Sequence, residues 1–355
     1  MSIYDKTMRK HEKEDVMERV YLWSETEYTY PLAFEFRPHI RTYLHPDPTA
    51  RPAVLICPGG AYNAVCPSEA QAIAEMFYRK GYQAFVLVYT TDVTSTAPLR
   101  LQPMQDASRA IRLLRSKAAE FRIDPKRLAV SGFSAGGHLA ACMCVHFADL
   151  SDPNPELARY SNRPDAAILG YAVLDFGEYA HAGTVLALLG EQPGQTERDY
   201  MSPCKNVTKD TPPCFIWHTA QDEYVPVEGS YRFAEACRRA GVAYAHHVFC
   251  TGPHGLSLAN DMWIHRQWED QDTLEQVDIL VKRIRAGKQG YNSKSAMLQG
   301  FLDHPTILDT LRYSFSPATH PNAEVAVWPE LVEPWLESVM PQKGDVLYGT
   351  CPKIL

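Results

Sequence analysis

The chain has 355 residues, 45% of them hydrophobic and 11% aromatic, enough to bury a large core as one large α/β domain or two small ones. Its formal net charge of -7, with no run of lysines or arginines, argues against nucleic acid or an anionic membrane surface as a partner. No apolar stretch approaches the ~20 residues that a membrane-spanning helix needs.

The N-terminus and the cysteines indicate a cellular compartment. Residues 1–19 are charged and lack the apolar segment of a secretory signal, so we expect a polar N-terminal arm and a cytoplasmic location. The chain has nine cysteines, an odd number without a C-x-x-C pair, and several lie inside apolar runs. Such cysteines are typical of small, reduced core residues.

The first part of the chain alternates between strand and helix patterns. Strand character is found at residues 20–23, 34–37, 40–44, 53–57 and 84–89, and amphipathic helices are predicted over 68–79 and 104–120. The run at 53–57 is apolar throughout, as expected of a central parallel strand buried on both faces. This alternation predicts crossover units, and hence an α/β fold with a mostly parallel central sheet and helices on both faces.

The next strand, predicted at residues 127–131, leads into Gly132-Phe133-Ser134-Ala135-Gly136, the G-x-S-x-G pattern of a nucleophile elbow. In such an elbow a serine is held on a sharp, strained turn between a strand and a helix, and glycines leave room where the two elements nearly touch. Residues 135–148, rich in alanine and other small side chains, are predicted to form the helix.

Beyond the elbow, strands are predicted at residues 166–171, 214–218 and 244–249, and helices over 183–189, up to 239, and over 276–286, 295–315 and 329–340. Between residues 260 and 321 the pattern is less regular. We therefore expect a single domain over residues 1–355, with a helical insertion at 260–321 before the last helix.

Three side chains follow predicted strands in the order that a hydrolase triad requires. A serine hydroxyl becomes a good nucleophile only when a base removes its proton, and the base needs an acid that fixes its orientation. Ser134, Asp222 and His254 occur in this order, each just past a strand end. Glu223 and, as a fallback, Asp175 stay open as the acid.

The remaining histidines near strands are assigned a different role. His218, His246 and His247 fall within or beside strands, and we expect them to be packed or hydrogen-bonded structural residues. His254 differs because it lies in the tight loop Gly252-Pro253-His254-Gly255 after a long strand.

An ester-cleaving serine also needs donors for the oxyanion that develops on the carbonyl oxygen. The backbone N–H of Ala135, at the start of the elbow helix, is one candidate. The loop containing Gly60 and Ala61 is suited to supply the others, because its small residues let the backbone approach a substrate. We expect neither a metal nor a cofactor, since no H-E-x-x-H, P-loop or G-x-G-x-x-G pattern is present.

These stretches together resemble those of α/β-hydrolase-fold esterases, specifically the bacterial acetyl-esterase and acetyl-xylan-esterase-like family. The matching stretches are 57–62 with Glu69, 105–115, 132–140, 211–227, 252–256, and 328–331 with Trp335. The resemblance covers about residues 50–260 and 323–340, and it implies an α/β-hydrolase fold that hydrolyses short acyl esters, often acetyl groups on sugars, without a cofactor.

Two features depart from the family's pattern. The third small residue of the oxyanion loop is usually glycine in the family, and here it is Ala61. Alanine keeps the backbone N–H, so we expect activity to be kept as well. Residues 260–321 stand where the family has a short connection. Because a segment of this length is seldom structureless, two interpretations stay open, a lid or oligomer contact and a peripheral helical decoration.

The sequence thus predicts a serine esterase acting on a small-molecule ester such as an acetylated oligosaccharide, with no nucleic-acid or membrane partner and with a homo-oligomer left open. An amide, formamide or peptide hydrolase on the same triad is the alternative within catalysis, since fold and function separate at the pocket. A binding protein that kept the fold and lost activity is the alternative of a different class.

Overall fold

The computed structural model describes residues 18–266, 272–304, 306 and 320–341. The predicted N-terminal arm, residues 1–19, lies almost entirely outside the described residues, as does the second half of the helix predicted over 295–315.

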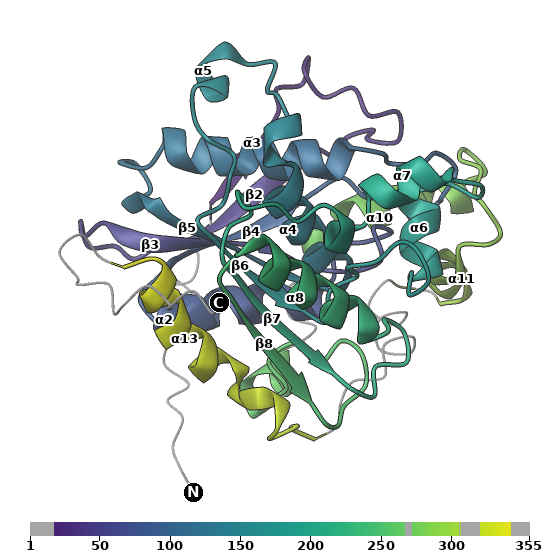
Figure 1. Cartoon of the computed structure of the whole chain (residues 1–355). Coiled ribbons are helices and arrows are strands. Elements are labelled where there is room, and N and C mark those ends of the chain that lie inside the picture. Colours follow the sequence, from purple (N-terminus) through teal and green to yellow (C-terminus); the bar gives the residue numbers. More distant parts are fainter. Residues whose placement is uncertain (1–17, 267–271, 305, 307–319, 342–355) are drawn as a thin grey trace, which may run out of the picture.

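The central sheet of the described chain has eight strands in the order β1-β2-β4-β3-β5-β6-β7-β8 (Figure 1). Their bounds are Arg19–Tyr21 (β1), His39–Tyr43 (β2), Arg51–Cys57 (β3), Gln83–Val88 (β4), Ile123–Phe133 (β5), Ala166–Gly170 (β6), Cys214–Thr219 (β7) and Tyr244–Phe249 (β8). β2 runs antiparallel to both β1 and β4, whereas every pair from β4 to β8 is parallel. The predicted α/β fold with a mostly parallel sheet is confirmed.

Each helix predicted from the sequence has a counterpart among the described α-helices, which also include α5, α7 and α9, three short helices that were not predicted. Their bounds are Gln71–Arg79 (α2), Gln102–Ser116 (α3), Ser134–His146 (α4), Pro155–Ala158 (α5), Ala182–Leu189 (α6), Gln195–Tyr200 (α7), Glu228–Ala240 (α8), Asp261–Arg266 (α9), Glu275–Arg285 (α10), Ala296–Asp303 (α11) and Trp328–Val339 (α13). None of these described helices is long and apolar enough to cross a bilayer.

Different helices cover the two faces of the sheet (Figure 1). In β3, Leu55 packs in the cluster that includes α3, α4 and α8, whereas Ile56 packs in the cluster that includes α2 and α13. Since successive side chains of a strand point to opposite faces, an uninterrupted apolar run such as 53–57 is what a strand covered on both sides requires.

The C-terminal helix α13 closes the second face through its first residue. The Trp328 ring stacks on Trp217 of β7 at a centroid distance of 5.5 Å, and its indole N–H donates to the carbonyl of Ser257. Trp328 is fully buried, so its N–H needs this acceptor. The helix therefore holds the loop that follows His254 against the sheet.

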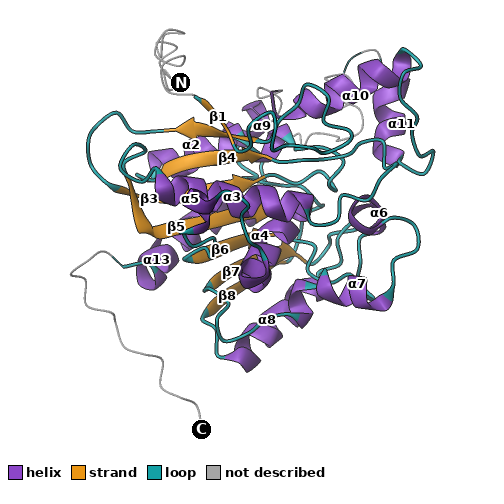
Figure 2. Ribbon diagram, turned by 90° about the horizontal axis from the view of Figure 1, so that it is seen from above, coloured by secondary structure: helices purple, strands orange, loops and turns teal. Residues whose placement is uncertain are grey.

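The segment after His254 packs at one end of the sheet. Helices α10 and α11 gather with α6 and α7 there, as both views show (Figures 1 and 2). Residues of α10 and α11 share an apolar cluster with Leu32, which lies between β1 and β2, and with Ala64 and Val93, which follow β3 and β4. The part of 260–321 that forms α10 and α11 is thus packed onto the loops at the strand ends, whereas α9 packs in the cluster that includes α2 and α13.

One predicted strand is wrong. Residues 34–37 form turns rather than a strand, with hydrogen bonds from the Ala33 N–H to the Tyr30 carbonyl and from the Phe36 N–H to the Ala33 carbonyl. Phe34 has a φ of 49°, which no strand residue adopts. A strand would place Phe34 and Phe36 on the same face. Instead, Phe36 is buried in the core, while Phe34 lies on the surface beneath the Arg283 guanidinium.

Buried histidines predict how stability depends on pH. Burial lowers the pKa of His39, of His138 and of His246 to about 4, below the ~6.5 of an unfolded chain. Between these values the unfolded chain binds protons that the folded chain does not, so the free energy of unfolding should fall as the pH drops from about 6.5 to 4, by about 1 kcal/mol per pH unit for each of these histidines. Urea unfolding followed at a series of pH values measures this slope.

A variant separates these histidines from other titrating groups. In His138→Gln the slope should fall by about 1 kcal/mol per pH unit, because glutamine does not titrate. Glutamine can still accept from the Tyr62 hydroxyl and donate to the Met201 carbonyl, the two bonds that His138 makes. Urea midpoints that stay constant over this pH range in the natural protein would contradict the assignment.

Candidate active site

Ser134 lies on the strained turn between β5 and α4. Its φ is 52°, in the left-handed region that serine rarely adopts, and its side chain is almost buried. The following glycine is required by close approach, since a Cβ on Gly136 would lie 2.0 Å from the carbonyl oxygen of Cys57. The structure therefore has the strand–turn–helix geometry that the G-x-S-x-G pattern predicts.

Ser134, His254 and Asp222 lie in one hydrogen-bonded line. His254 Nε2 is 2.9 Å from Ser134 Oγ, and His254 Nδ1 is 2.7 Å from Asp222 Oδ2. An ionised carboxylate only accepts hydrogen bonds, so Nδ1 carries the proton and Nε2 is left to accept from the serine hydroxyl. The three residues follow β5, β8 and β7, at the edge where doubly wound sheets bind ligands.

The Asp222 side chain is fully buried and accepts hydrogen bonds on both oxygens. Its Oδ1 accepts from the backbone N–H groups of Tyr224 and Val225, at 3.0 and 2.8 Å, while Oδ2 faces both His254 and His218. Burial disfavours the charged form, but the bonds from the two histidines outweigh it and hold the pKa of Asp222 well below its usual range. Asp222 is therefore ionised at neutral pH.

The two other acids considered from the sequence are placed elsewhere. Glu223 is exposed to solvent. Asp175 is buried, and its Oδ2 lies 2.6 Å from Nη1 of Arg232, with which it forms an ion pair. Of the three candidates, Asp222 is the one that contacts His254.

The histidines expected to be structural are packed and hydrogen-bonded. His246 bonds the Ser230 hydroxyl, and His247 packs on an aromatic ring of β7. His218 is fully buried and bonds a backbone carbonyl, yet its Nε2 also lies 3.2 Å from Asp222. His218 thus contributes to the surroundings of the acid, a contact that the sequence did not predict.

Two of the predicted oxyanion donors, Gly60 and Ala61, line the same cavity as Ser134. Gly60 and Ala61 follow β3, and their N–H groups donate to no other residue that the structure describes. Ala135 is the second residue of α4, so its N–H has no partner within the helix. Ala61 has a φ of 53°, which costs alanine about 1 kcal/mol and is the conformation that glycine adopts freely.

Buried hydrogen bonds hold the oxyanion loop in this shape. The Tyr62 hydroxyl donates to Nδ1 of His138 at 2.7 Å, while Nε2 of that histidine donates to the Met201 carbonyl. The Tyr89 hydroxyl donates to the carbonyl of Pro58 at 2.6 Å. The loop is therefore tied both to the elbow helix and to β4 before any substrate binds.

Ser134 opens into a cavity of about 1200 Å³. Its walls come from the oxyanion loop, from the segment around α6, from Arg198 of α7 and from the loop that carries His254. Polar side chains on the wall include Asn63, Ser95 and His181, and apolar ones include Val185, Leu186 and Leu256.

The described part of residues 260–321 forms one wall of this cavity. Trp263 of α9 and Lys294, Ser295 and Met297 at the start of α11 line it. Lys294 forms an ion pair of 2.7 Å with Glu191, across from it on the segment after α6. The segment is therefore placed to shape the pocket.

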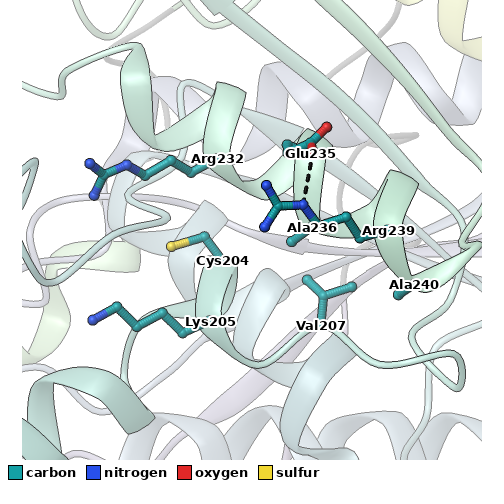
Figure 3. Close-up of a pocket in the computed structure, with 8 residues that line it drawn as sticks. All are labelled: Cys204, Lys205, Val207, Arg232, Glu235, Ala236, Arg239 and Ala240. Carbon is teal, nitrogen blue, oxygen red and sulfur yellow. Dashed lines mark hydrogen bonds and ion pairs between the residues drawn. The ribbon is translucent and has the colours of Figure 1, made fainter.

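A second, more open depression of about 520 Å³ lies between α8 and the turn at Pro203–Lys205 (Figure 3). Its lining residues are Cys204, Lys205, Val207, Arg232, Glu235, Ala236, Arg239 and Ala240. Its cations are already paired: Lys205 with Asp199, Arg232 with Asp175, and Arg239 with Glu235. The two depressions share no lining residue, and this one lacks a nucleophile paired with a base.

Two buried residues beside the serine have roles that the sequence did not predict. Glu69, noted from the sequence only as part of the oxyanion stretch, accepts a hydrogen bond from the hydroxyl of Tyr171 at 2.7 Å. Tyr171 follows β6 and its ring meets that of His254. Its position at the end of the strand predicted over 166–171 was the available signal. Within the described ranges, no three His, Cys, Asp or Glu side chains gather as a metal site requires.

Comparison with known sequences identifies relatives of the chain. Residues 42–237 match the BD-FAE family. Over 240 residues the chain is 48% identical to endo-1,4-beta-xylanase B of Butyrivibrio fibrisolvens, covering 68% of this chain and 38% of that protein. Over 247 residues it is 24% identical to an acetylxylan esterase of Xylanibacter ruminicola, covering 68% and 48%. The chain thus spans less than half the length of these two curated relatives.

Among solved structures, an acetyl ester-xyloside bifunctional hydrolase from Caldicellulosiruptor lactoaceticus resembles the chain along most of its length. The TM-score is 0.65 at 35% sequence identity, and the alignment covers 74% of this chain and 96% of that one. The family match spans more than half of the chain and includes the elbow. The chain therefore belongs to the BD-FAE family, and its eight-stranded, mostly parallel sheet has the α/β-hydrolase fold.

Proposed function

We propose that the protein is a serine esterase that removes short acyl groups, above all acetyl, from carbohydrates or other small alcohols through an acyl-enzyme. The observation that carries this proposal is the line of hydrogen bonds from Ser134 Oγ through His254 to Asp222. A binding protein without activity would have no need of a strained serine in contact with a base.

The proposed reaction begins with Ser134. Its Oγ attacks the ester carbonyl while Nε2 of His254 takes the hydroxyl proton, and Asp222 stabilises the imidazolium that forms. The N–H groups of Gly60, Ala61 and Ala135 donate to the oxyanion of the tetrahedral intermediate. When the intermediate collapses, His254 returns the proton to the leaving alcohol and Ser134 keeps the acyl group.

The second half of the reaction repeats these roles with water. His254 takes a proton from the water that attacks the acyl-enzyme, and the same N–H groups hold the second oxyanion. Collapse breaks the ester bond to Ser134, His254 returns its proton to the serine oxygen, and the free acid leaves. Asp222 stays ionised through both halves, since the histidine bonds keep its pKa well below neutral.

The cavity supports a substrate larger than an acetyl group alone. Its volume of about 1200 Å³ exceeds that of a typical site for a small molecule, so a sugar unit fits beside the serine. The amide, hydroxyl and imidazole groups of Asn63, Ser95 and His181 on its wall are suited to hydrogen-bond sugar hydroxyls. The names of the Xylanibacter and Caldicellulosiruptor relatives, which refer to acetylxylan and to acetyl esters, support the same substrate class.

Glycoside hydrolysis, suggested by the names of the Butyrivibrio and Caldicellulosiruptor relatives, is supported less well. It requires two carboxyl groups flanking the bond, one of them able to act as an acid. The carboxyl groups that line the cavity belong to Glu69 and Glu191. Both oxygens of Glu69 accept hydrogen bonds from protein groups, and Glu191 is paired with Lys294.

We also place the protein in a reducing compartment such as the cytoplasm. The eight cysteines that the structure describes are free thiols. Burial raises the pKa of Cys57 and of Cys66 to about 12, so these thiols are unreactive core groups.

A substrate panel tests the proposed function. The enzyme should release acetate from acetylated xylo-oligosaccharides and hydrolyse para-nitrophenyl acetate with a higher kcat/KM than para-nitrophenyl octanoate. It should have no measurable activity on para-nitroacetanilide or para-nitrophenyl xyloside, and Ser134→Ala should lower its esterase activities by about 10⁶-fold. Comparable kcat/KM values for the anilide and the acetate would favour the amide-hydrolase alternative instead.

A further inference from the structure

Glu69 is a buried carboxyl group on the cavity wall that the triad mechanism does not use. It ends the 3-10 turn Pro67–Glu69, and only 3% of the residue is exposed. Its Oε2 accepts from the backbone N–H of Gly59 at 2.6 Å, and its Oε1 accepts from the hydroxyl of Tyr171 at 2.7 Å. A buried carboxyl group is costly unless such donors stabilise it, so its presence beside the serine calls for a role.

The hydrogen bonds around Glu69 are satisfied when it is ionised. The Tyr171 oxygen already accepts from the N–H of Ser257 at 3.1 Å, so its own hydrogen is donated to Glu69. A protonated Glu69 that donated to Tyr171 would leave this hydroxyl hydrogen without an acceptor. Burial raises the pKa of Glu69, and the bonds from Tyr171 and Gly59 oppose that rise.

One carboxylate oxygen of Glu69, Oε2, contacts the oxyanion loop. Gly59 directly precedes Gly60, and it is pressed between Glu69 and the elbow. A Cβ on Gly59 would lie 2.8 Å from both Glu69 Oε2 and Ser134 Cβ. The bond from Gly59 to the carboxylate therefore fixes the loop against the serine.

The other carboxylate oxygen, Oε1, is linked through Tyr171 to the catalytic base, His254. The ring of Tyr171 meets the ring of His254 edge to face, with centroids 5.0 Å apart and an interplanar angle of 75°. Tyr171 has a φ of 35°, a strained conformation for a tyrosine, and its N–H donates to the Trp217 carbonyl of β7. Glu69 holds the hydroxyl end of this ring and so restrains the surface on which the imidazole lies.

We propose that Glu69 is a positioning residue that fixes the oxyanion loop through Gly59 and the imidazole of His254 through Tyr171. This inference rests on the proposed esterase function. Glu69 contacts neither Ser134 Oγ nor the ester carbonyl that it attacks. Its loss should therefore lower the stability of the transition state rather than the affinity for substrate. A displacement of about 1 Å at either the donors or the base costs about 10²-fold in rate.

The variant Glu69→Gln tests this role. A glutamine keeps the shape but cannot accept from both Gly59 and Tyr171, since one of its two terminal groups is a donor. We expect kcat for para-nitrophenyl acetate to fall about 10²-fold with KM nearly unchanged. The inhibition constant of an aryl trifluoromethyl ketone, whose serine adduct mimics the oxyanion, should rise by a similar factor.

Glu75→Gln is the matched control, the same change on the next helix, α2. Glu75 bonds Gln71 and Arg79 and does not line the cavity, so this variant should keep the wild-type values. A Glu69→Gln enzyme with wild-type kcat, or with a raised KM alone, would overturn the inference. A wild-type protein without esterase activity would overturn the proposed function, and this inference with it.

Tyr171→Phe keeps the test decisive if Glu69→Gln does not fold. It removes only the hydroxyl, leaving the bond between Glu69 and Gly59 in place. We expect a drop in kcat of about 10-fold, smaller than that of Glu69→Gln because the bond from Gly59 to Glu69 is kept. An unchanged kcat in a folded Tyr171→Phe enzyme would show that the hydrogen bond between Glu69 and Tyr171 has no effect on the reaction.

Discussion

Ser134→Ala should lower kcat for para-nitrophenyl acetate by about 10⁶-fold, the scale on which other serine enzymes lose activity when the nucleophile is removed. The reason is the absence of any other nucleophile in contact with Nε2 of His254 among the described residues. Initial rates measured over a wide range of enzyme concentrations would establish the loss. The residual rate should come from the oxyanion donors and the binding site alone.

Ser131→Ala is the matched control for this loss. Ser131 lies on β5 three residues before the nucleophile, it is fully buried, and its hydroxyl has no hydrogen-bond partner. Removing that hydroxyl should leave kcat unchanged. If Ser134→Ala kept a rate within about 10²-fold of wild type, Ser134 could not be the nucleophile.

Asp222→Asn should lower kcat by about 10⁴-fold with little change in KM, as in other triads. The carboxylate accepts the proton of Nδ1 at 2.7 Å, and an amide group presented there can favour the wrong tautomer of His254. Because the pKa of Asp222 lies well below its usual range, the wild-type carboxylate stays ionised when the pH is lowered to about 5. Steady-state rates of both enzymes between about pH 5 and 9 would measure the loss.

Glu223→Gln provides the comparison for this variant. Glu223 is the exposed neighbour of Asp222, so the same carboxyl-to-amide change there should leave kcat close to the wild-type value. If kcat were near wild type in Asp222→Asn and strongly lowered in Glu223→Gln, the acid of the triad would be Glu223 instead. Asp175 is not expected to substitute, since its carboxylate is paired with Arg232.

The candidate site was predictable from sequence to the extent that it depends on local patterns at strand ends. A parallel sheet brings the ends of β5, β7 and β8 to one edge, so the proximity of Ser134, Asp222 and His254 could be predicted without coordinates. The strained turn at Ser134 has a local signature as well, because only small residues fit around it.

Contacts between distant segments could not be predicted in this way. Glu69 and Tyr171 are 102 positions apart, and nothing in either local pattern indicates that they meet. The cavity wall formed by Trp263 and Lys294 depends on how the segment after His254 folds back, which the periodicity of its helices does not specify. The strand predicted at 34–37 failed because the burial of Phe36 in a turn imitates the alternation of a strand.

The central claim, that Ser134 is made nucleophilic by His254, is tested most directly by labelling with a fluorophosphonate probe followed by peptide mass mapping. We expect one probe per chain, attached to the peptide that contains Ser134, with labelling abolished in Ser134→Ala and retained in Ser131→Ala. Labelling that persists in Ser134→Ala, or an active wild-type esterase that the probe leaves unmodified, would contradict it.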